Sequence, residues 1–459
     1  MALNIVIMAA GKGTRMKSAR PKVLHRLAGA TLLQHVLQAS AALGAARTVI
    51  VTGHGADAVE AASRGEGRAF VRQEPQLGTG HAVQQAVPEL PEHGTTLILN
   101  GDVPLIRAET AQALVAACAG ERLVLLTVDL ADPTGYGRII REGEQVRAIV
   151  EHKDATPQQR QIREGYTGMM AAPTAHLKRW LANLKNDNAQ REYYLTDIVA
   201  MAVADGVPVV ATPASGETEV LGVNSPLQLA DLERRYQRQQ AERLMEAGVR
   251  LMDPARFDVR GTLACGRDVS IDVNCVFEGE VELGDDVRIG AHCMIRNARI
   301  AAGAVIHPFT HIDGEAAGAE VGEGALIGPF ARLRPGAKLG PEVHIGNFVE
   351  VKNSTLARGA KANHLAYLGD AVVGERVNYG AGSITANYDG ANKHRTTIEH
   401  DVHIGSNCVL VAPVTIGAGA TVGGGSTITK DVPPGHLSVA RGRQVAVAGW
   451  NRPAKAAKA

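Results

Sequence analysis

The chain has 459 residues, of which 45% are apolar and 21% charged, and its formal net charge is +1. That length exceeds what one hydrophobic core usually holds, so at least two domains are expected. The dispersed charge argues against a broad nucleic-acid surface, and no window reaches the ~18 uninterrupted apolar residues of a membrane span. Five cysteines without a Cys-x-x-Cys pair, and no signal-peptide pattern at the N-terminus, favour a reducing cytoplasm.

Residues 1 to about 225 alternate between short apolar runs and helical patterns. The apolar runs predict strands at 4–8, 48–52, 96–99 and 123–128, and the helical patterns include 32–43 and 108–119. Alternation of this kind predicts an α/β domain with a mainly parallel sheet and helices on both faces. Ligands of such folds bind at the carboxyl ends of the strands.

The first predicted strand runs into a glycine-rich segment, Ala9-Ala10-Gly11-Lys12-Gly13-Thr14-Arg15-Met16, followed by Pro21-Lys22. Glycines after a strand let backbone N–H groups approach phosphates, and Arg15 and Lys22 can supply positive charge there. The segment is not a Walker A loop, and Met16 stands where a dinucleotide-binding loop needs its third glycine.

Two further segments follow predicted strands. Asp102, in Leu99-Asn100-Gly101-Asp102, could hold Mg²⁺ against a triphosphate, or could simply be a turn residue. The segment Gln73 to His81 offers amide, hydroxyl and backbone groups that could read a base edge, or could simply open a helix.

Residues 226–248 alternate apolar and charged positions and predict one long helix. It would either link two domains or cover the surface of the first. Residues from about 250 to 438 carry repeats, and between Val321 and Ile428 an aliphatic residue returns at every sixth position, often followed by glycine. Two runs are in phase: Val321, Ile327, Leu333, Leu339, Ile345 and Val351; then Ile398, Ile404, Leu410, Ile416, Val422 and Ile428. This period predicts a hexapeptide-repeat parallel β-helix, with the aliphatic side chain in the core and glycine adopting the backbone angles of the corner. The basic tail from Arg452 is predicted to be disordered.

Three hexads make one coil, so residues 18 apart should stack at strand spacing, ~4.8 Å. Arg334 and Lys352 are 18 apart, and two cations without an adjacent acid predict an anion site, unless they are a solvated corner pair. Ser406 and Gly424 should share another edge. The period slips by four between Val351 and Val373, near His364, and is interrupted at 385–397. Both interruptions predict loops on a binding face, and His364 becomes a candidate base.

With both halves considered, the chain resembles the bacterial bifunctional GlmU family. That family combines N-acetylglucosamine-1-phosphate uridyltransferase with glucosamine-1-phosphate N-acetyltransferase. The resemblance rests on Ala-Gly-Lys-Gly-Thr-Arg-Met, Pro-Lys-Val-Leu-His, Gln-Leu-Gly-Thr-Gly-His-Ala, Asp-Pro-Thr-Gly-Tyr-Gly-Arg, Val-Glu-His-Lys-Asp-Ala and Asn-Tyr-Asp-Gly-Ala-Asn-Lys. It implies a Rossmann-like nucleotidyltransferase domain at 1–225, a linker helix at 226–248, and a left-handed β-helix acetyltransferase domain at 249–459. It also implies a cytoplasmic homotrimer that uses UTP, acetyl-coenzyme A and Mg²⁺ in cell-envelope synthesis.

The resemblance also implies the site residues. Nucleotide and sugar would be bound by Ala9, Ala10, Gly11, Lys22, Gln73, Gly78, Thr79, Asn100, Gly101, Asp102, Gly137, Glu151 and Asn224, with Asp102 and Asn224 on Mg²⁺ and Arg15 and Lys22 in catalysis. The amino-sugar phosphate would be bound by Arg334, Lys352, Tyr367 and Asn378, with His364 as the catalytic base. Acetyl-coenzyme A would be bound by Ala381, Asn387, Tyr388, Ser406, Gly424 and Arg441.

Three positions depart from the family pattern. Asn100 stands where that pattern has Tyr before Gly-Asp, Tyr166 stands where it has a sugar-contacting Asn, and Gly424 replaces Ala. Tyr166 is therefore left out of the predicted contacts. One alternative is a monofunctional hexose-1-phosphate nucleotidyltransferase whose β-helix is an oligomerisation platform. The other is a binding protein that uses a degenerate hexapeptide repeat as its scaffold. Arg334, Lys352 and His364 argue against the first, and Lys22, Asp102 and Asn224 against the second.

Overall fold

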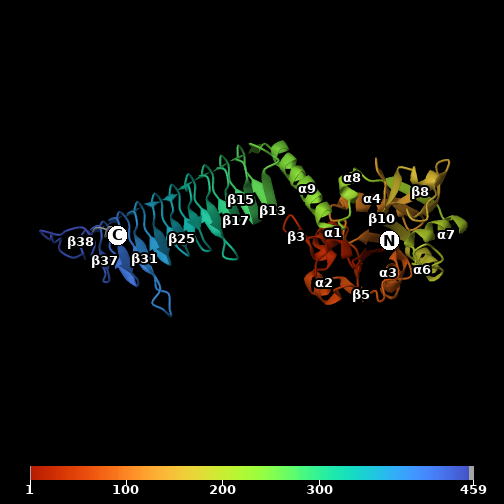
Figure 1. The fold of residues 1–459 in the computed structure, drawn as a ribbon, viewed down its shortest axis with the longest axis horizontal. Coiled ribbons are helices and arrows are strands. Elements are labelled where there is room, and N and C mark those ends of the chain that lie inside the picture. The colour runs from red at the N-terminus through yellow and green to blue at the C-terminus, as the bar shows by residue number, and fades with distance from the viewer. Residues whose placement is uncertain (1, 454–459) are drawn as a thin grey trace, which may run out of the picture. The chain divides into compact units, whose positions relative to one another are not determined.

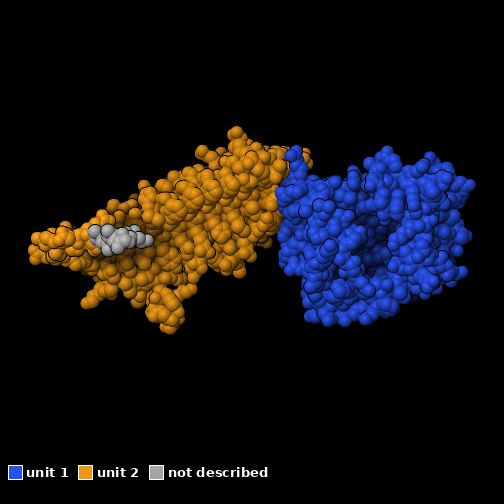
Figure 2. Space-filling view, in the orientation of Figure 1, with its two compact units in different colours: residues 1–239 blue, residues 240–459 orange. Residues whose placement is uncertain are grey.

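The computed structural model describes residues 2–453, and its elements are shown in Figure 1. The chain divides into two compact units between Gln239 and Gln240 (Figure 2). No helix within residues 2–453 is long and apolar enough to cross a membrane. The predicted disordered tail lies outside the described residues from 454 onward. All five cysteines are free, and four of them are buried.

Unit 1 is an α/β domain around a nine-stranded sheet of order β11-β7-β10-β6-β1-β4-β5, with β8 and β9 added beside β10. Along the path from β11 to β5, four of the six pairings are parallel, which fits the predicted mainly parallel sheet. The antiparallel pairings are those of β10 with β6, β7 and β8, and of β8 with β9. The strands are β1 Leu3–Met8, β4 Arg47–Thr52, β5 Arg68–Arg72, β6 Thr95–Asn100, β7 Leu123–Asp129, β8 Gly137–Glu142, β9 Gln145–Val150, β10 Glu164–Pro173 and β11 Val209–Pro213, with a small separate hairpin of β2 Arg26–Leu27 and β3 Ala30–Thr31.

The helices of unit 1 pack on both faces of this sheet because successive strand residues point to opposite sides. Val6 enters the core beneath α3, whereas Ile5 and Ile7 enter the core beneath α1 and α4. The helices are α1 Leu32–Ala41, α2 Ala56–Ser63, α3 Thr79–Ala86, α4 Ala108–Cys118, α5 Pro157–Arg160, α6 Thr174–Ala182, α7 Ile198–Ala204 and α8 Glu217–Val220, with short 3₁₀ turns η1 Thr14–Met16, η2 Lys22–Leu24, η3 Val87–Glu89 and η4 Leu195–Asp197. The predicted strands and helices are thus present within a residue or two of their expected ends.

Helix α9, Pro226–Glu246, contains the division between the units. Leu232 is buried with the unit 1 residues Leu27 and Leu32. Ala241 instead belongs to the core of unit 2, against which Leu244 packs. The helix therefore contributes a face to each unit and does more than cover the surface of the first.

Unit 2 is a left-handed parallel β-helix of hexapeptide repeats with three faces. One face is the sheet β12 Arg250–Leu251, β14 Ser270–Ile271, β16 Arg288–Ile289, β18 Val305–Ile306, β21 Leu326–Ile327, β24 His344–Asn347, β27 Lys361–His364, β30 Asn378–Tyr379, β33 His403–Ile404, β36 Thr421–Val422 and β38 Leu437–Ser438.

A second, 16-stranded sheet forms the other two faces. It begins with the long strands β13 Phe257–Cys265, β15 Cys275–Leu283 and β17 Met294–Ile300, and then divides. One branch is β19 His311–Asp313, β22 Arg332–Leu333, β25 Glu350–Lys352, β28 Tyr367–Gly369, β31 Ile384–Ala386, β34 Val409–Val411 and β37 Thr427–Ile428; the other is β20 Ala319–Val321, β23 Lys338–Leu339, β26 Thr355–Leu356, β29 Ala371–Val373, β32 Thr396–Ile398 and β35 Val414–Ile416.

The six-residue aliphatic period marks the core, as predicted. Every residue of the two in-phase runs is at most 4% exposed. The expected role of the following glycine holds at Gly328, whose φ is 95°, but it is wrong at Gly322, Gly346 and Gly405, which do not have positive φ. A Cβ on any of these three would lie 2.0–2.5 Å from backbone atoms of the next coil. Glycine is required there because neighbouring coils approach closely.

The predicted loop near His364 is also absent. The ladder continues through β27 and β28, and the phase slip arises because two steps, Val351 to Leu356 and Leu368 to Val373, are five residues long. Shortened corners change the register without inserting a loop. The interruption at 385–397 is a true loop, which projects between β31 and β32 (Figure 1).

Candidate functional site

A pocket opens at the carboxyl ends of β1 and β6, where α/β folds bind ligands. Its volume is about 290 Å³. Nine residues of the predicted nucleotide set line it: Ala9, Ala10, Gly11, Lys22, Gln73, Gly78, Thr79, Asn100 and Asp102. Gly101 does not, because its N–H donates to the Met8 carbonyl at 2.9 Å and a Cβ there would point at the same strand. We call this cavity the nucleotide pocket.

Two glycines shape the wall of the nucleotide pocket. A Cβ on Gly11 would meet no atom within 4 Å, so the backbone there faces open space that a phosphate could enter. Gly78 has a φ of 107°, and a Cβ on it would lie 2.6 Å from the Tyr193 carbonyl oxygen. The Gln73 side-chain amide donates to the Gly78 carbonyl at 2.8 Å and holds this loop against the pocket.

Lys22, Asp102 and Asn224 converge beside the nucleotide pocket. The Lys22 ammonium donates to Asp102 Oδ2 and, at 3.0 Å, to Asn224 Oδ1. Two oxygens that share one ammonium lie close enough together to hold one small cation. Mg²⁺ prefers few protein oxygens plus phosphates, so this donor set fits it. No cluster of three or more acidic, His or Cys ligands occurs within residues 2–453, and this mode of binding requires none.

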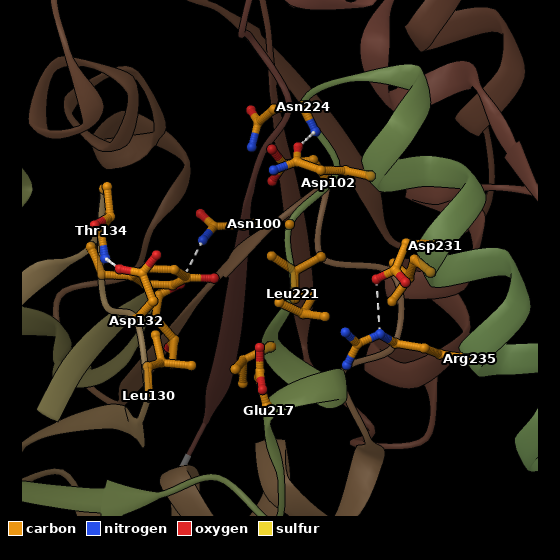
Figure 3. Close-up of a pocket in the computed structure, with 18 of the residues that line it drawn as sticks. Asn100, Asp102, Leu130, Asp132, Thr134, Glu217, Leu221, Asn224, Asp231 and Arg235 are labelled. Atoms are coloured by element: carbon orange, nitrogen blue, oxygen red, sulfur yellow. Dashed lines mark hydrogen bonds and ion pairs between the residues drawn. The ribbon is translucent and has the colours of Figure 1, made fainter. Parts of the chain in front are cut away.

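A larger cavity, about 730 Å³, adjoins these residues (Figure 3). Arg15 is also among the residues that line it. Asp102 and Asn224 lie at one end, and the Asp231–Arg235 ion pair of α9 lies at another (Figure 3). The sequence predicted that Arg15 and Lys22 act at the same phosphate site. In the structure they line different cavities, because Lys22 lines the nucleotide pocket and Arg15 lines the larger one.

A third cavity, about 210 Å³, contains Gly137 and Glu151 of the predicted sugar contacts. We call it the sugar pocket. Burial raises the pKa of Glu151, although a hydrogen bond from the Thr196 hydroxyl at 3.1 Å opposes this effect. Tyr166 lines the sugar pocket too, despite its exclusion from the predicted contacts. Thr196, in the short turn η4, and Tyr136, in the connection between β7 and β8, were not predicted as site residues, because no periodicity identifies such short segments.

In unit 2 one column of residues runs along a corner of the β-helix. His364 is aligned with Asn347 of the preceding coil, and its Nδ1 lies 2.8 Å from Asn347 Oδ1. If Nδ1 carries the proton, this bond leaves Nε2 free to accept one. The column continues through Ala381, Ser406 and Gly424, because Ala362, Tyr379, Ile404 and Val422 are in register two residues earlier. The predicted base and three predicted acetyl-coenzyme A contacts therefore occupy successive coils.

The cation cluster differs from the predicted one. Arg334 and Lys352 do lie on adjacent coils, since Leu333 pairs with Val351. The prediction that no acid lies near the two cations is wrong, because Arg334 Nη1 lies 2.8 Å from Glu350 Oε1. The Lys393 ammonium, followed by burial, lowers the pKa of Lys352. Lys393 therefore lies beside Lys352 as a third cation, and its only sequence signal was the motif Asn-Tyr-Asp-Gly-Ala-Asn-Lys that contains it.

The loop between β31 and β32 carries Asn387, Tyr388 and Lys393. Asn387 is 8% exposed, and its side-chain amide donates to the Asp370 carboxylate. Tyr388 is 61% exposed. Tyr367 is in register with Glu350, the ion-pair partner of Arg334, on the next coil. Asn378 lies in β30 on a different face, and Arg441 donates to the Gly424 carbonyl at 2.7 Å. No side-chain hydrogen bond or ion pair within residues 2–453 joins Asn378 to the cations.

Comparison with known proteins finds two different families along the chain. Residues 5–251 match the MobA-like NTP transferase domain, and residues 318–353 and 395–430 match the bacterial transferase hexapeptide (six repeats). The chain is 78% identical to the bifunctional protein GlmU of Methylibium petroleiphilum and 58% identical to that of Aromatoleum aromaticum, with 99% of each chain covered in both cases. A solved UDP-glucose pyrophosphorylase complexed with UDP-glucose covers 52% of this chain and 100% of its own at 16% identity and a TM-score of 0.43, too weak a likeness to support an argument.

Proposed function

This chain belongs to the family of bifunctional GlmU proteins, and from that premise we propose how its two units perform the two reactions. It is a bifunctional transferase that acetylates glucosamine 1-phosphate from acetyl-coenzyme A. It then couples N-acetylglucosamine 1-phosphate to UTP, giving UDP-N-acetylglucosamine and pyrophosphate for cell-envelope synthesis. We assign uridylyl transfer to the chain before α9 and acetyl transfer to the chain after it.

The convergence of Lys22, Asp102 and Asn224 carries the assignment of the uridylyl site. The sugar phosphate oxygen attacks the α-phosphorus of UTP in line, and pyrophosphate leaves. Lys22 neutralises the charge that develops on the phosphates, while the backbone at Gly11 holds them in position. Mg²⁺, held by Asp102 and Asn224, would add further neutralisation. Arg15 approaches the phosphates from the large cavity, which shares Asp102 with the nucleotide pocket.

The column from Asn347 to Gly424 carries the assignment of the acetyl site. His364 accepts a proton from the sugar amine as that amine attacks the thioester carbonyl, and Asn347 orients the imidazole for this step. The thiol of coenzyme A is the leaving group. Arg334, Lys352 and Lys393 bind the phosphate, which relieves the repulsion between the two lysines. Ala381, Ser406 and Gly424 line the path of the coenzyme along the corner.

We also propose that the enzyme is a cytoplasmic homotrimer that assembles through the β-helix. The supporting feature is an aromatic ladder, in which His292, Phe309, Phe330 and Phe348 stack with ring centroids 4.8–5.3 Å apart. Phe348 is 56% exposed, and Leu365 continues the ladder beside His364. A second copy would cover this apolar edge, and the loop at Asn387 would reach a neighbouring subunit. Sedimentation should give a trimer, and a stable, active monomer would exclude it.

The decisive experiment incubates the full chain with glucosamine 1-phosphate, acetyl-coenzyme A, UTP and Mg²⁺, and omits each in turn. UDP-N-acetylglucosamine should form only in the complete mixture. Supplying N-acetylglucosamine 1-phosphate should remove the need for acetyl-coenzyme A. Uridylyl transfer without any acetyl transfer would instead favour the monofunctional alternative, which family membership argues against.

A further inference from the structure

The segment that follows β11 leads to Asn224, and a buried carboxylate lies on its way. Glu219, in α8, is 4% exposed, and no ion pair with it occurs among the described residues. Burying a carboxylate without a cation costs free energy unless hydrogen bonds satisfy both of its oxygens. The partners of Glu219 therefore show what this buried charge holds in place.

Both carboxylate oxygens of Glu219 accept hydrogen bonds from neighbouring segments. Oε1 accepts from the Arg107 N–H at 3.1 Å. Oε2 accepts from the Ser215 hydroxyl at 2.6 Å and from the Ser215 N–H at 3.3 Å. Glu219 therefore ties α8 to the residue that precedes α4 and to the segment that leaves β11.

The bond from Arg107 to Glu219 is one of two cross-links between the segments that carry the proposed Mg²⁺ ligands. At the other cross-link, the Val223 N–H donates to the Asp102 carbonyl at 3.0 Å. The end of the first segment thus meets the start of the second, and the start of the first meets the end of the second. The two segments therefore run antiparallel, and Asp102 and Asn224 lie at the same end.

We infer that Glu219 is a positioning residue for the proposed Mg²⁺ site. By fixing the distant end of the antiparallel pair, it holds Asn224 against Asp102, where both side chains share the Lys22 ammonium. Glu219 lines none of the three cavities of unit 1, so it acts on the site only through the backbone. The inference rests on the proposed uridylyl transfer and concerns how that site keeps its metal ligands together.

The test compares two substitutions that separate the reach of the Glu219 side chain from its charge. Glu219→Gln loses the charge but keeps the length, so its oxygen can accept from the Arg107 N–H while its NH₂ donates to the Ser215 hydroxyl. Glu219→Asp keeps the charge but is one methylene shorter and cannot reach both partners. We expect Glu219→Gln to resemble the starting enzyme and Glu219→Asp to be impaired.

The first readout is uridylyl transfer by the full-length protein over a range of Mg²⁺ concentrations. In Glu219→Asp the Mg²⁺ concentration for half-maximal rate should rise by about tenfold or more, because loss of the groups that orient a metal ligand has effects of this size. The kcat at saturating Mg²⁺ and the KM for N-acetylglucosamine 1-phosphate should stay within about threefold. Glu219→Gln should match the starting enzyme in all three quantities.

Two further readouts require no turnover. Calorimetric binding of UTP without sugar phosphate, repeated at several Mg²⁺ concentrations, should need about tenfold more Mg²⁺ in Glu219→Asp. Hydrogen exchange at the Val223 amide, which donates to the Asp102 carbonyl, should be faster in the same variant. Both measurements follow the metal ligands directly, independently of the chemical step.

Thr174→Val is the matched control for a loss of stability alone. The Thr174 and Thr96 hydroxyls are fully buried and lie 2.9 Å apart at the amino end of β6, opposite the proposed Mg²⁺ site. Thr174→Val should lower the thermal stability of unit 1 because it removes a buried hydrogen bond. It should leave the Mg²⁺ requirement and the exchange of the Val223 amide unchanged.

Several results would overturn the inference. An unchanged Mg²⁺ requirement in Glu219→Asp, or an equal shift in Thr174→Val, would show that Glu219 serves only stability. Impairment of Glu219→Gln with normal behaviour of Glu219→Asp would show that charge matters and reach does not. If Glu219→Asp fails to fold, Ser215→Ala, which removes one hydroxyl donor, should still raise the Mg²⁺ requirement by about two- to fivefold, and no rise would refute the positioning role.

Failure of the proposed function would look different. An unaltered enzyme that does not couple N-acetylglucosamine 1-phosphate to UTP would show that the proposed reaction is wrong, before any variant is made. An active enzyme whose Mg²⁺ requirement is insensitive to Glu219 would instead contradict the positioning role alone.

Discussion

Asp370 ties down both ends of the loop that carries Asn387 and Lys393. Its carboxylate accepts hydrogen bonds from the Asn387 and Asn353 amides, and its backbone carbonyl accepts one from Thr396 at 3.2 Å. We predict that Asp370→Asn loosens this loop and weakens acetyl transfer. The replacement is isosteric, and asparagine tolerates the left-handed conformation at this position, where φ is 50°.

The magnitude follows from the geometry around Asp370, which is 8% exposed. One of its two accepting oxygens becomes an NH₂ group that faces another side-chain NH₂ group. A hydrogen bond to a charged group contributes about 1.5–3 kcal/mol, so its loss should favour loop opening by about 10- to 150-fold. The KM for acetyl-coenzyme A should rise, because Asn387 would leave its position for part of the time, whereas uridylyl transfer should not change.

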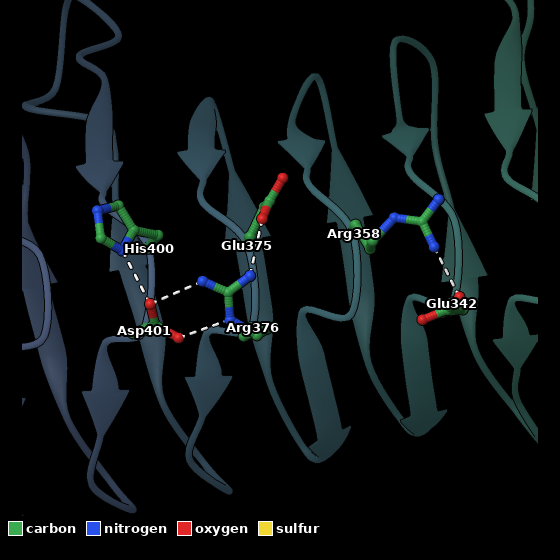
Figure 4. A network of polar contacts seen from close by, with 6 residues as sticks. All are labelled: Glu342, Arg358, Glu375, Arg376, His400 and Asp401. Carbon is green, nitrogen blue, oxygen red and sulfur yellow. Dashed lines mark hydrogen bonds and ion pairs between the residues drawn. The ribbon is translucent and has the colours of Figure 1, made fainter.

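Amide hydrogen exchange across residues 387–395, together with the kinetics of both reactions, measures the effect. Asp401→Asn is a matched control, because Asp401 also has positive φ and accepts from two side chains, Arg376 and His400, on an exposed corner (Figure 4). It should leave loop exchange and acetyl transfer unchanged. The reasoning fails if Asp370→Asn leaves loop exchange at the starting rate, or if exchange increases throughout the β-helix.

Three further predictions concern the separation of the sites. His364→Ala should lower the kcat of acetyl transfer by roughly 10²–10⁴-fold, whereas Lys352→Ala should mainly raise the KM for glucosamine 1-phosphate; kinetics that do not separate these effects would contradict the assigned roles. A fragment ending at Arg250 should retain uridylyl transfer, and a folded fragment that releases no pyrophosphate would contradict the domain assignment. Backbone N–H groups of Asn392 and Ala391 and the His394 ring hold the pKa of Asp389 below its usual range, so this carboxylate contributes loop stability above the ordinary Asp pKa and loses it as pH falls through the lowered value. The protection of the loop amides, taken relative to their intrinsic exchange rate at each pH, should therefore fall only in acid, and Asp389→Asn should already show lower protection at pH 7.

The sequence alone predicted the β-helix and the strands of unit 1, because both produce a periodic pattern of buried residues that follows from local backbone geometry. Burial at every sixth residue requires three short strands per coil, so the aliphatic runs from Val321 and Ile398 predicted the β-helix directly. The apolar runs of unit 1 similarly predicted its strands, and the glycine-rich segment after β1 predicted where the nucleotide pocket opens. The role of the repeat glycines could not be read in this way, because their constraint is imposed by the neighbouring coil.

The composition of the sites was decided by tertiary structure, because contacts between distant segments leave no periodic trace. Asn224 meets Lys22 across 202 residues, and no spacing rule connects them. The column at His364 depends on coils of 17, 18 and 25 residues, whose lengths vary with shortened corners and one inserted loop. Lys393 comes near Lys352 because it lies at the base of the projecting loop, where it pairs with Tyr388, and Asn100 shares a cavity with Tyr166 because β10 lies beside β6.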